Sequence, residues 1–318
     1  MSRENVKKKA VIIGAGFVGS SVAYALTLRN IANEIVLVDI DRDKAEGESL
    51  DIRHGMPDIG DTIVRAGGYS DCADCGLIII TAGVGRKPGQ SRRDLTAENI
   101  GIMRGVIESI KPYYAGSVIL VISNPVDVLT YMVDKWLESP KGRSFSSGCS
   151  LDTSRLVSCL ADHFKVSTRM IDAVVIGEHG DDQIPLWSAV RIAGVPVGQY
   201  CEKNDIEWNE QIRADLALKT KKMGSSIIKR KGKTNYGIAT CACNIADSVL
   251  NDKPTLFSVS SVLHGEYGTE NAALSVPSIV DASGVSKTVS IPLSEKEHDA
   301  FSNAAKAVRS LLAEFEHI

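Results

Sequence analysis

The chain has 318 residues, which is enough for one large domain or two ordinary domains with separate cores. Hydrophobic residues make up 44% and charged residues 24%, a composition that excludes a disordered or fibrous chain. The net charge of -3 disfavours nucleic acid as the main partner, because phosphate binding usually shows as a basic excess. The apolar runs are of strand length and residues 1–9 lack the apolar stretch of a secretory signal, so we expect a cytoplasmic protein without a membrane span.

The seven cysteines show no spacing typical of a disulfide framework, and we expect reduced thiols. Cys72 and Cys75 have the spacing of half a zinc site. A zinc site would need a second ligand pair, which the sequence does not offer, so we predict no metal.

The first predicted strand, residues 9–13, ends directly in a glycine turn, and an apolar helical pattern follows it. A second strand, residues 34–38, ends at Asp39, about twenty residues beyond the last glycine, the spacing of a dinucleotide-binding unit. The glycines allow a tight turn, room for a pyrophosphate and close packing of helix on strand, and the helix N-terminus faces the phosphates. The alternative is an ordinary glycine turn in an α/β protein. The predicted cofactor residues of this unit are Gly14, Gly16, Phe17, Val18, Gly19 and Asp39.

The charge of Asp39 indicates which dinucleotide binds. Its carboxylate can accept hydrogen bonds from the adenosine ribose, and no arginine follows that could hold a 2′-phosphate. We therefore predict NAD rather than NADP.

Strands predicted at residues 62–66, 77–81, 118–123 and 145–149 alternate with helical patterns. This alternation predicts an α/β fold with a doubly wound parallel sheet of the Rossmann type. Ligands bind such sheets at the carboxyl ends of the strands. The predicted cofactor site therefore extends to Thr81, Ala82, Gly83, Ser123 and Asn124.

After about residue 148 the pattern changes to longer helices mixed with short strands. Helices are predicted at residues 153–164, 210–229, 236–250 and 295–316, and strands at 173–176, 255–262 and 288–293. We predict an NAD-binding Rossmann domain at residues 1–148 and an α+β substrate domain at 149–318, packed closely with a cleft between them.

His179 lies in the polar stretch Gly177-Glu178-His179-Gly180-Asp181 and is the candidate acid/base, since histidine titrates near pH ~6.5. The alternative is a structural turn. Asp152 and Arg155 lie three residues apart at the start of a predicted helix. They form either a surface pair or two parts of a site, in which Arg155 binds a carboxylate and Asp152 orients His179.

Residues 84–93 combine glycines, a proline and four cations, typical of a solvated loop. Such a loop can also close over a substrate and deliver an arginine into the site.

Together these motifs resemble the L-lactate/L-malate dehydrogenases, in order and spacing and over essentially the whole chain. The matching motifs are residues 14–19, Lys87-Pro88-Gly89 with Arg92, Ser123-Asn124-Pro125, Leu151-Asp152-Thr153-Ser154-Arg155, and residues 177–181. In overall pattern the chain is most similar to the bacterial lactate dehydrogenase branch, which implies NAD-dependent interconversion of pyruvate and L-lactate in fermentative glycolysis.

The resemblance also implies roles for individual residues. His179 protonates the ketone oxygen and Asp152 is its partner, while Arg155 anchors the substrate carboxylate. Arg92 polarises the carbonyl. Asn124 contacts the substrate or the nicotinamide ribose, and Thr234 lines the pocket.

Arg86 stands where lactate-specific members of this family usually have glutamine and malate-specific members have arginine. An arginine there would pair with the second carboxylate of oxaloacetate, and closure over pyruvate would leave it unpaired. We expect a lactate-type chain in which Arg86 confers or adds oxaloacetate activity; a dedicated L-malate dehydrogenase is the alternative.

The resemblance further implies a homo-oligomer, a dimer or a tetramer. At the positions through which many bacterial members bind fructose 1,6-bisphosphate, this chain has Val157 and Asp172, so we expect no activation by that sugar. Two other classes stay open. One is a non-catalytic NAD-binding module. The other is an NAD-dependent glycosidase that also needs a metal, for which Cys149 is the one candidate ligand and no further ligand set is evident.

Overall fold

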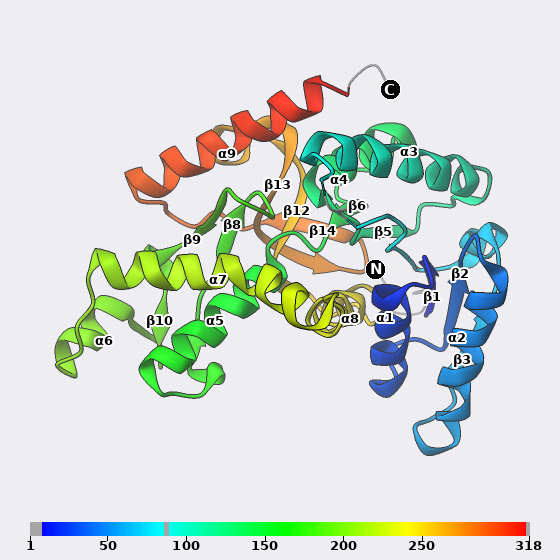
Figure 1. Ribbon diagram of the computed structural model, residues 1–318, viewed down its shortest axis with the longest axis horizontal. Coiled ribbons are helices and arrows are strands. Elements are labelled where there is room, and N and C mark those ends of the chain that lie inside the picture. Colours follow the sequence, from blue (N-terminus) through cyan, green and yellow to red (C-terminus); the bar gives the residue numbers. More distant parts are fainter. Residues whose placement is uncertain (1–7, 86–88, 316–318) are drawn as a thin grey trace.

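The computed structural model describes residues 8–85 and 89–315 (Figure 1). One large sheet runs through it in the order β3-β2-β1-β4-β5-β6-β12-β13-β8-β9, and β14 pairs with β13. The strands of this sheet are β1 (Lys9–Ile13), β2 (Glu34–Val38), β3 (Ile63–Ala66), β4 (Leu77–Ile80), β5 (Val118–Val121), β6 (Ser144–Ser146), β8 (Val175–Gly177), β9 (Gln183–Pro185), β12 (Thr255–His264), β13 (Glu270–Asp281) and β14 (Gly284–Thr288). A second sheet contains β7 (Ile171–Asp172), β10 (Arg191–Ile192) and β11 (Val195–Pro196).

The first six strands are parallel, and helices cover both faces of this part of the sheet. The nine α-helices of the described residues are α1 (Phe17–Leu28), α2 (Arg42–His54), α3 (Arg92–Ile110), α4 (Val126–Leu137), α5 (Ser150–Phe164), α6 (Val197–Lys203), α7 (Glu210–Lys231), α8 (Tyr236–Leu250) and α9 (Glu295–Ala313).

Alternate residues of β1 face opposite layers, as the pleat of a strand requires. Ala10 and Ile12 pack with α1, α2 and α8, whereas Val11 and Ile13 pack with α3, α4 and α9. All five β1 residues are buried, because a parallel sheet covered on both faces needs continuous apolar strands rather than alternating ones. The predicted doubly wound α/β fold is confirmed.

The carboxyl-terminal half continues the same sheet with antiparallel strands. β12 pairs with β6 through Ser260 and Ser146, and β12 and β13 form a long antiparallel pair. Helix α5 contacts α7, α8 and β12. Among the described residues no helix is long and apolar enough to cross a membrane.

From residue 145 onward the structure differs from several of the predicted elements. The strand predicted at residues 145–149 is β6 and ends at Ser146, because Cys149 already caps α5. The strand predicted at 288–293 is wrong: β14 ends at Thr288, where pairing with Ser278 of β13 stops. The long strand β13 was not predicted, and neither were the short elements β7, β9, β10, β11 and α6.

Candidate active site

The glycine turn between β1 and α1 is shaped by close backbone contacts. Gly14 has φ +104°, and a Cβ there would lie 2.8 Å from the Ala82 nitrogen. A Cβ on Gly19 would lie 1.8 Å from the Gly14 carbonyl oxygen. A Cβ on Gly16 would meet nothing within 4 Å. Gly14 and Gly19 therefore allow the helix and the strand to pack, and the space over Gly16 is open to a ligand.

The N-terminus of α1 is suited to a pyrophosphate. Its N-cap, Gly16, makes no side-chain hydrogen bond, and the first helical turn has no acidic residue. The free N–H groups and the helix dipole favour an anion there. Phe17, at the first helical position, is 61% exposed, and the Lys233 ammonium lies 3.9 Å from its ring centroid. This end of the helix fits the diphosphate of a dinucleotide.

Asp39 directly follows β2, beside the same turn. Its Oδ2 accepts a hydrogen bond from the Ala15 N–H at 2.6 Å, and its Oδ1 accepts one from the Asp41 N–H at 3.0 Å. The carboxylate thus holds the glycine turn in place. Val18 packs against the core beneath the turn.

The ends of β4 and β5 lie next to the turn, as the sequence predicted. Thr81 donates from its hydroxyl to the Gly14 carbonyl at 2.9 Å, and Ser123 donates to the Ala82 carbonyl at 2.5 Å. Gly83 follows Ala82 with a nearly extended backbone, at φ +159°. The strand-end residues therefore form one continuous rim with residues 14–19.

Asn99, on α3, joins the two loops of this rim and was missed from the sequence. Its side-chain amide donates to the carbonyls of Val84 at 3.0 Å and Asn124 at 2.9 Å, and its Oδ1 accepts from the Val84 N–H. It is only 3% exposed. Polar residues are common in this segment, so the sequence offered no signal that set Asn99 apart.

His179, Asp152 and Arg155 lie together, as predicted. His179 Nδ1 is 2.6 Å from Asp152 Oδ2, and Arg155 Nη1 donates to Asp152 Oδ1 at 2.9 Å. The Asp152 side chain is 2% exposed, so the interpretation as a surface pair is wrong. Asp152 contacts both partners at once.

The opposite charges of His179 and Asp152 favour the ionised form of both side chains, although both are buried. Burial alone would lower the pKa of His179. The negative charges of Asp152 and, to a smaller extent, Asp127 outweigh burial, so the pKa of His179 is raised above its ordinary value. Burial opposes ionisation of Asp152 as well, yet His179 and Arg155 hold the pKa of Asp152 below its usual range. A proton on His179 is therefore stabilised by a carboxylate that stays charged.

Arg155 and Thr234 line a cavity of about 450 Å³ between α5, α7 and α8. A Cβ on Gly224 of α7 would come within 3.3 Å of Arg155 Nη2, so the glycine leaves room for the guanidinium. Most of the lining is apolar, and Leu151, Met223, Ile227 and Ile238 contribute to it. A small molecule with one anionic group fits this environment.

Asp127 is a second carboxylate at His179 and was also missed. It lies in the first turn of α4, is 2% exposed, and its Oδ2 accepts the backbone N–H of His179 at 2.8 Å. Its only signal in the sequence was an acidic residue within an apolar helical run.

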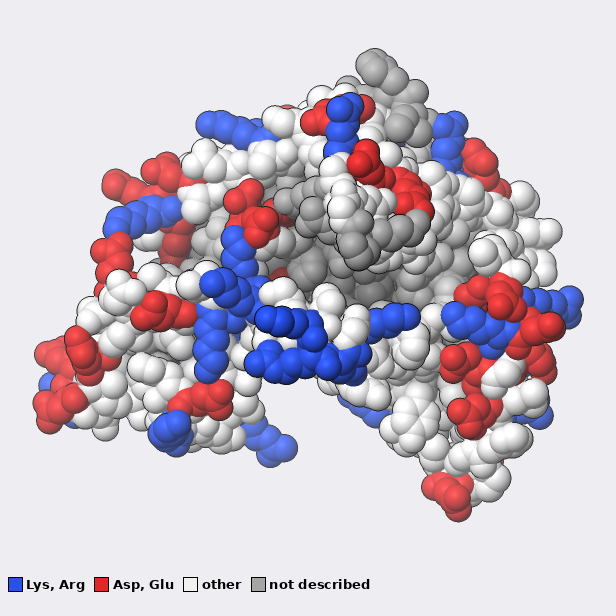
Figure 2. All heavy atoms as spheres, in the orientation of Figure 1, with Lys and Arg blue, Asp and Glu red and all other residues white. Residues whose placement is uncertain are grey.

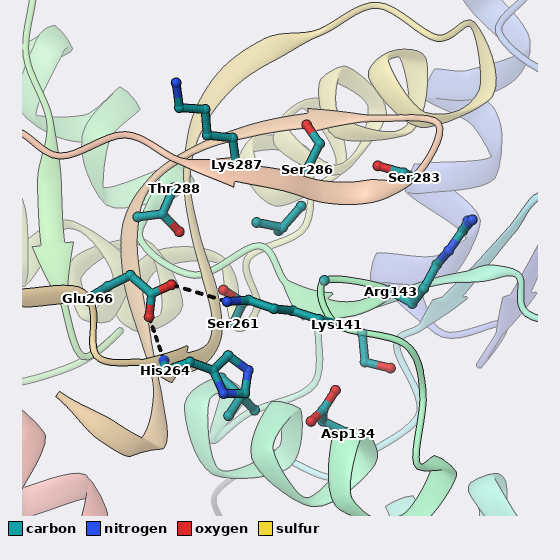
Figure 3. Close-up of a pocket in the computed structure, with 14 residues that line it drawn as sticks. Asp134, Lys141, Arg143, Ser261, His264, Glu266, Ser283, Ser286, Lys287 and Thr288 are labelled. Carbon is teal, nitrogen blue, oxygen red and sulfur yellow. Dashed lines mark hydrogen bonds and ion pairs between the residues drawn. The ribbon is translucent and has the colours of Figure 1, made fainter. Parts of the chain in front are cut away.

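Another hollow, of about 370 Å³, lies between the α4–β6 connection and β14 (Figure 3). Lys141 pairs with Glu266 at 3.5 Å, and Arg143 and Lys287 point away from each other in Figure 3. Because its cations do not converge, this hollow lacks the arrangement that binds a carboxylate.

Two predicted site residues lie wholly or partly outside the described part of the chain. Arg86 lies outside the described residues. Arg92 begins α3 after the N-cap Ser91, and its side chain is likewise outside the described part. Within that part, no three His, Cys, Asp or Glu side chains are grouped to hold a metal ion, and Cys72, Cys75 and Cys149 are buried free thiols.

Comparison with known proteins agrees with this geometry. The family model "lactate/malate dehydrogenase, NAD binding domain" matches residues 8–146, and "lactate/malate dehydrogenase, alpha/beta C-terminal domain" matches 149–318. An L-lactate dehydrogenase of Clostridium perfringens is 39% identical over 316 residues, 99% of each chain. The ligand-bound crystal structure of a minor L-lactate dehydrogenase from Enterococcus mundtii superposes with a TM-score of 0.93 at 37% identity, covering 98% of this chain and 99% of that one.

The match to an NAD-binding domain, together with the glycine turn and the carboxylate-paired histidine, identifies an NAD-dependent oxidoreductase. The matches span both halves, and the chain belongs to the lactate/malate dehydrogenase family.

Proposed function

We propose that this enzyme reduces pyruvate to L-lactate with NADH, and catalyses the reverse reaction. The observation that carries the proposal is the contact of His179 with buried Asp152, which also holds Arg155 at a cavity. The curated relatives named L-lactate dehydrogenase, matched over nearly their whole length, support the choice of substrate.

The cofactor fits the glycine turn, where Gly14, Gly16, Phe17, Val18 and Gly19 would hold its diphosphate and Asp39 its adenosine ribose. Thr81, Ala82, Gly83, Ser123 and Asn124 would line the path of the nicotinamide half. The chemistry that NADH supplies there is hydride transfer to the carbonyl carbon of the keto acid.

The chain's own residues do the rest. Arg155 binds the carboxylate through the part of its guanidinium that Asp152 leaves free. Because Nδ1 of His179 is occupied by Asp152, Nε2 is the atom that gives its proton to the ketone oxygen. Arg92 polarises the carbonyl, and Asn124 and Thr234 position the substrate.

Oxaloacetate is the second candidate substrate, because Arg86 offers a partner for a second carboxylate. With pyruvate in a closed site, Arg86 would be desolvated and unpaired, at a cost on the order of 3–5 kcal/mol. We therefore propose that Arg86 confers or adds oxaloacetate activity in a chain that otherwise resembles the lactate dehydrogenases.

Steady-state NADH oxidation with pyruvate and with oxaloacetate tests the specificity. We expect oxaloacetate turnover in the native enzyme, and a shift of the kcat/KM ratio toward pyruvate by roughly 10²-fold or more in Arg86→Gln. A native preference for pyruvate that Arg86→Gln leaves unchanged would refute the role of Arg86.

The wider assignment follows from the same family. We propose an NAD-binding domain at residues 1–148, a substrate domain at 149–318, a homodimer or homotetramer, and a cytoplasmic location. We also propose that fructose 1,6-bisphosphate does not activate, because Val157 packs into the core and Asp172 is an exposed anion. A leftward shift of the substrate saturation curve on adding that sugar would contradict this.

A further inference from the structure

Asp127 is buried at the point where the cofactor rim meets the histidine loop. It stands two residues beyond Pro125, and α4 begins at Val126. The carbonyl of Asn124, just before, is fixed by Asn99. The start of α4 therefore follows directly on the rim residues Ser123 and Asn124. It also bears the Asp127 carboxylate, which accepts the backbone N–H of His179, 52 residues later in the chain.

The two oxygens of this carboxyl have different surroundings. Oδ2 accepts the His179 N–H at 2.8 Å. Oδ1 has no hydrogen-bond partner among the described residues, and neither has the buried hydroxyl of Ser260. The Ser260 hydroxyl nevertheless lies close enough to lower the pKa of Asp127, although burial dominates and raises that pKa to about 6.

A carboxylate is an expensive group for this position. An asparagine oxygen would accept the same N–H without the cost of burying a charge. Among the described residues, His179 is the cation whose charge lowers the pKa of Asp127, while Glu178 opposes the charge of Asp127 and the Cys149 thiol is neutral because burial raises its pKa. The negative charge of Asp127 therefore acts on the imidazole of His179, whose protonated form Asp152 also favours and Arg155 opposes from α5.

We propose that Asp127 is a positioning residue for the acid/base histidine. It fixes the backbone of His179 through Oδ2, and its negative charge favours the protonated imidazole together with Asp152. This inference rests on the proposed function in taking His179 as the proton donor. It adds a second carboxylate, on the cofactor side of the cleft, to the one at Nδ1.

Two variants separate the parts of this role. Asp127→Asn keeps the volume and an acceptor oxygen and removes the charge. Asp127→Leu removes both. Asp134→Asn is the matched control, because Asp134 is a partly buried carboxylate seven residues further along α4 that faces the hollow in Figure 3 rather than His179.

The expected readout is the pH dependence of kcat/KM for keto-acid reduction, which falls as pH rises and His179 loses its proton. In Asp127→Asn this fall moves to lower pH by about 0.5–1 unit, while KM for the keto acid and for NADH changes little. In Asp127→Leu, kcat falls by roughly 10- to 100-fold through misplacement of His179. Asp134→Asn keeps the native profile.

An unshifted profile in Asp127→Asn overturns the proposal, and so does an equal shift in Asp134→Asn. If Asp127→Asn does not fold, Ser260→Ala replaces it. That variant leaves Asp127 in place and removes the hydroxyl that lowers its pKa, so Asp127 stays neutral to higher pH. We expect a smaller shift in the same direction, and an unshifted profile there overturns the proposal equally.

An NMR titration of the His179 imidazole in the cofactor-free protein gives a readout that needs no turnover. We expect a lower titration midpoint in Asp127→Asn than in the native protein; an unchanged midpoint contradicts the inference even if the enzyme is active. Failure of the native enzyme to oxidise NADH with either keto acid would instead remove the proposed function and leave the titration result standing.

Discussion

At the scale of single residues, the site consists of carboxylates buried around one histidine. Asp152 has two cationic partners and its pKa is lowered, whereas Asp127 has one N–H and its pKa is raised to about 6. The two carboxylates therefore affect stability in opposite directions. Asp152 is stabilising in its charged form, and Asp127 is destabilising in its charged form.

We predict that Asp127→Asn raises the free energy of unfolding at neutral pH. A folded-state pKa raised from 3.8 to about 6 corresponds to about 3 kcal/mol of stability that is present below pH ~4 and is lost as the pH rises to ~6. Asparagine is neutral throughout this range. Urea denaturation at pH 5 and pH 7.5 measures the effect, and the two proteins should differ more at pH 7.5.

The control for this prediction is Asp152→Asn, which should lower the free energy of unfolding at pH 7.5. The pKa of that carboxyl is lowered, and asparagine removes the negative charge that His179 and Arg155 stabilise, so the buried guanidinium of Arg155 loses its ion-pair partner. If Asp127→Asn destabilises the protein by a similar amount, the buried charge of Asp127 is not costly and our account of it fails.

At the scale of elements, α1 is held against β1 and β4 by glycines. Gly19 faces the Gly14 carbonyl and Gly14 faces the end of β4, so the helix start packs directly on backbone and on the hydroxyl of Thr81. This contact fixes the direction in which the free N–H groups of α1 point. Packing and cofactor binding thus depend on the same residues.

We predict that Gly19→Ala lowers both stability and NADH affinity. Its Cβ would lie 1.8 Å from a backbone oxygen that cannot move without displacing the turn, and overpacking of this kind costs about 1–3 kcal/mol. Gly47→Ala on α2 is the control. A Cβ there meets nothing within 4 Å, and alanine should stabilise the helix by about 0.5–1 kcal/mol. Urea denaturation and NADH fluorescence titration test both, and equal effects would contradict this account.

The sequence predicted the elements that have strong local signals. The glycine turn, the five apolar strands that follow one another in the first half, and α8 all came from short-range patterns. β13 was missed because Pro277 interrupts its apolar run, although tertiary pairing with β12 at Ser258 keeps it extended. Residues 289–293 were predicted as a strand on composition, but ladder pairing ends at Thr288 and only one further backbone hydrogen bond to β13 is described, from the Val289 N–H to the Pro277 carbonyl.

The residues of the site were likewise predictable where they belong to a local motif, and not where a tertiary contact gives them their role. His179, Asp152 and Arg155 lie in motifs whose chemistry can be recognised from the residues alone. Asn99 and Asp127 are polar residues of amphipathic helices outside any recognisable motif, and each acts through a partner that only the fold brings near. No local pattern could have shown those contacts.

At the scale of the whole molecule, charge is distributed unevenly despite the net value of -3. The exposed cations of α7 and the loop after it are Lys219, Lys221, Lys222, Lys229, Arg230, Lys231 and Lys233, and no acidic residue lies between positions 216 and 246. They gather as a blue patch at the centre of the face in Figure 2. Lys231 lines the cavity of Arg155, and Lys233 lies at the start of α1, so the patch borders both halves of the site.

We predict that this basic patch steers the anionic substrate and cofactor. Raising ionic strength from about 0.02 to 0.3 M should lower kcat/KM for the keto acid, because exposed charges are screened beyond ~10 Å at 0.1 M. The double variant Lys229→Gln, Arg230→Gln should show a weaker salt dependence with unchanged kcat. Lys287→Gln, at the hollow of Figure 3, should behave as the native enzyme. A salt dependence that survives the double variant would rule out steering by these residues.

The central claim, that His179 delivers the proton in an NAD-dependent reduction of a 2-keto acid, is tested most directly by comparing the native enzyme with His179→Asn. Both proteins should bind NADH with similar affinity, because His179 is outside the glycine turn. We predict that the native enzyme oxidises NADH in the presence of keto acid and that kcat of the variant is lower by roughly 10²- to 10⁴-fold. A variant that retains the native kcat would contradict the account.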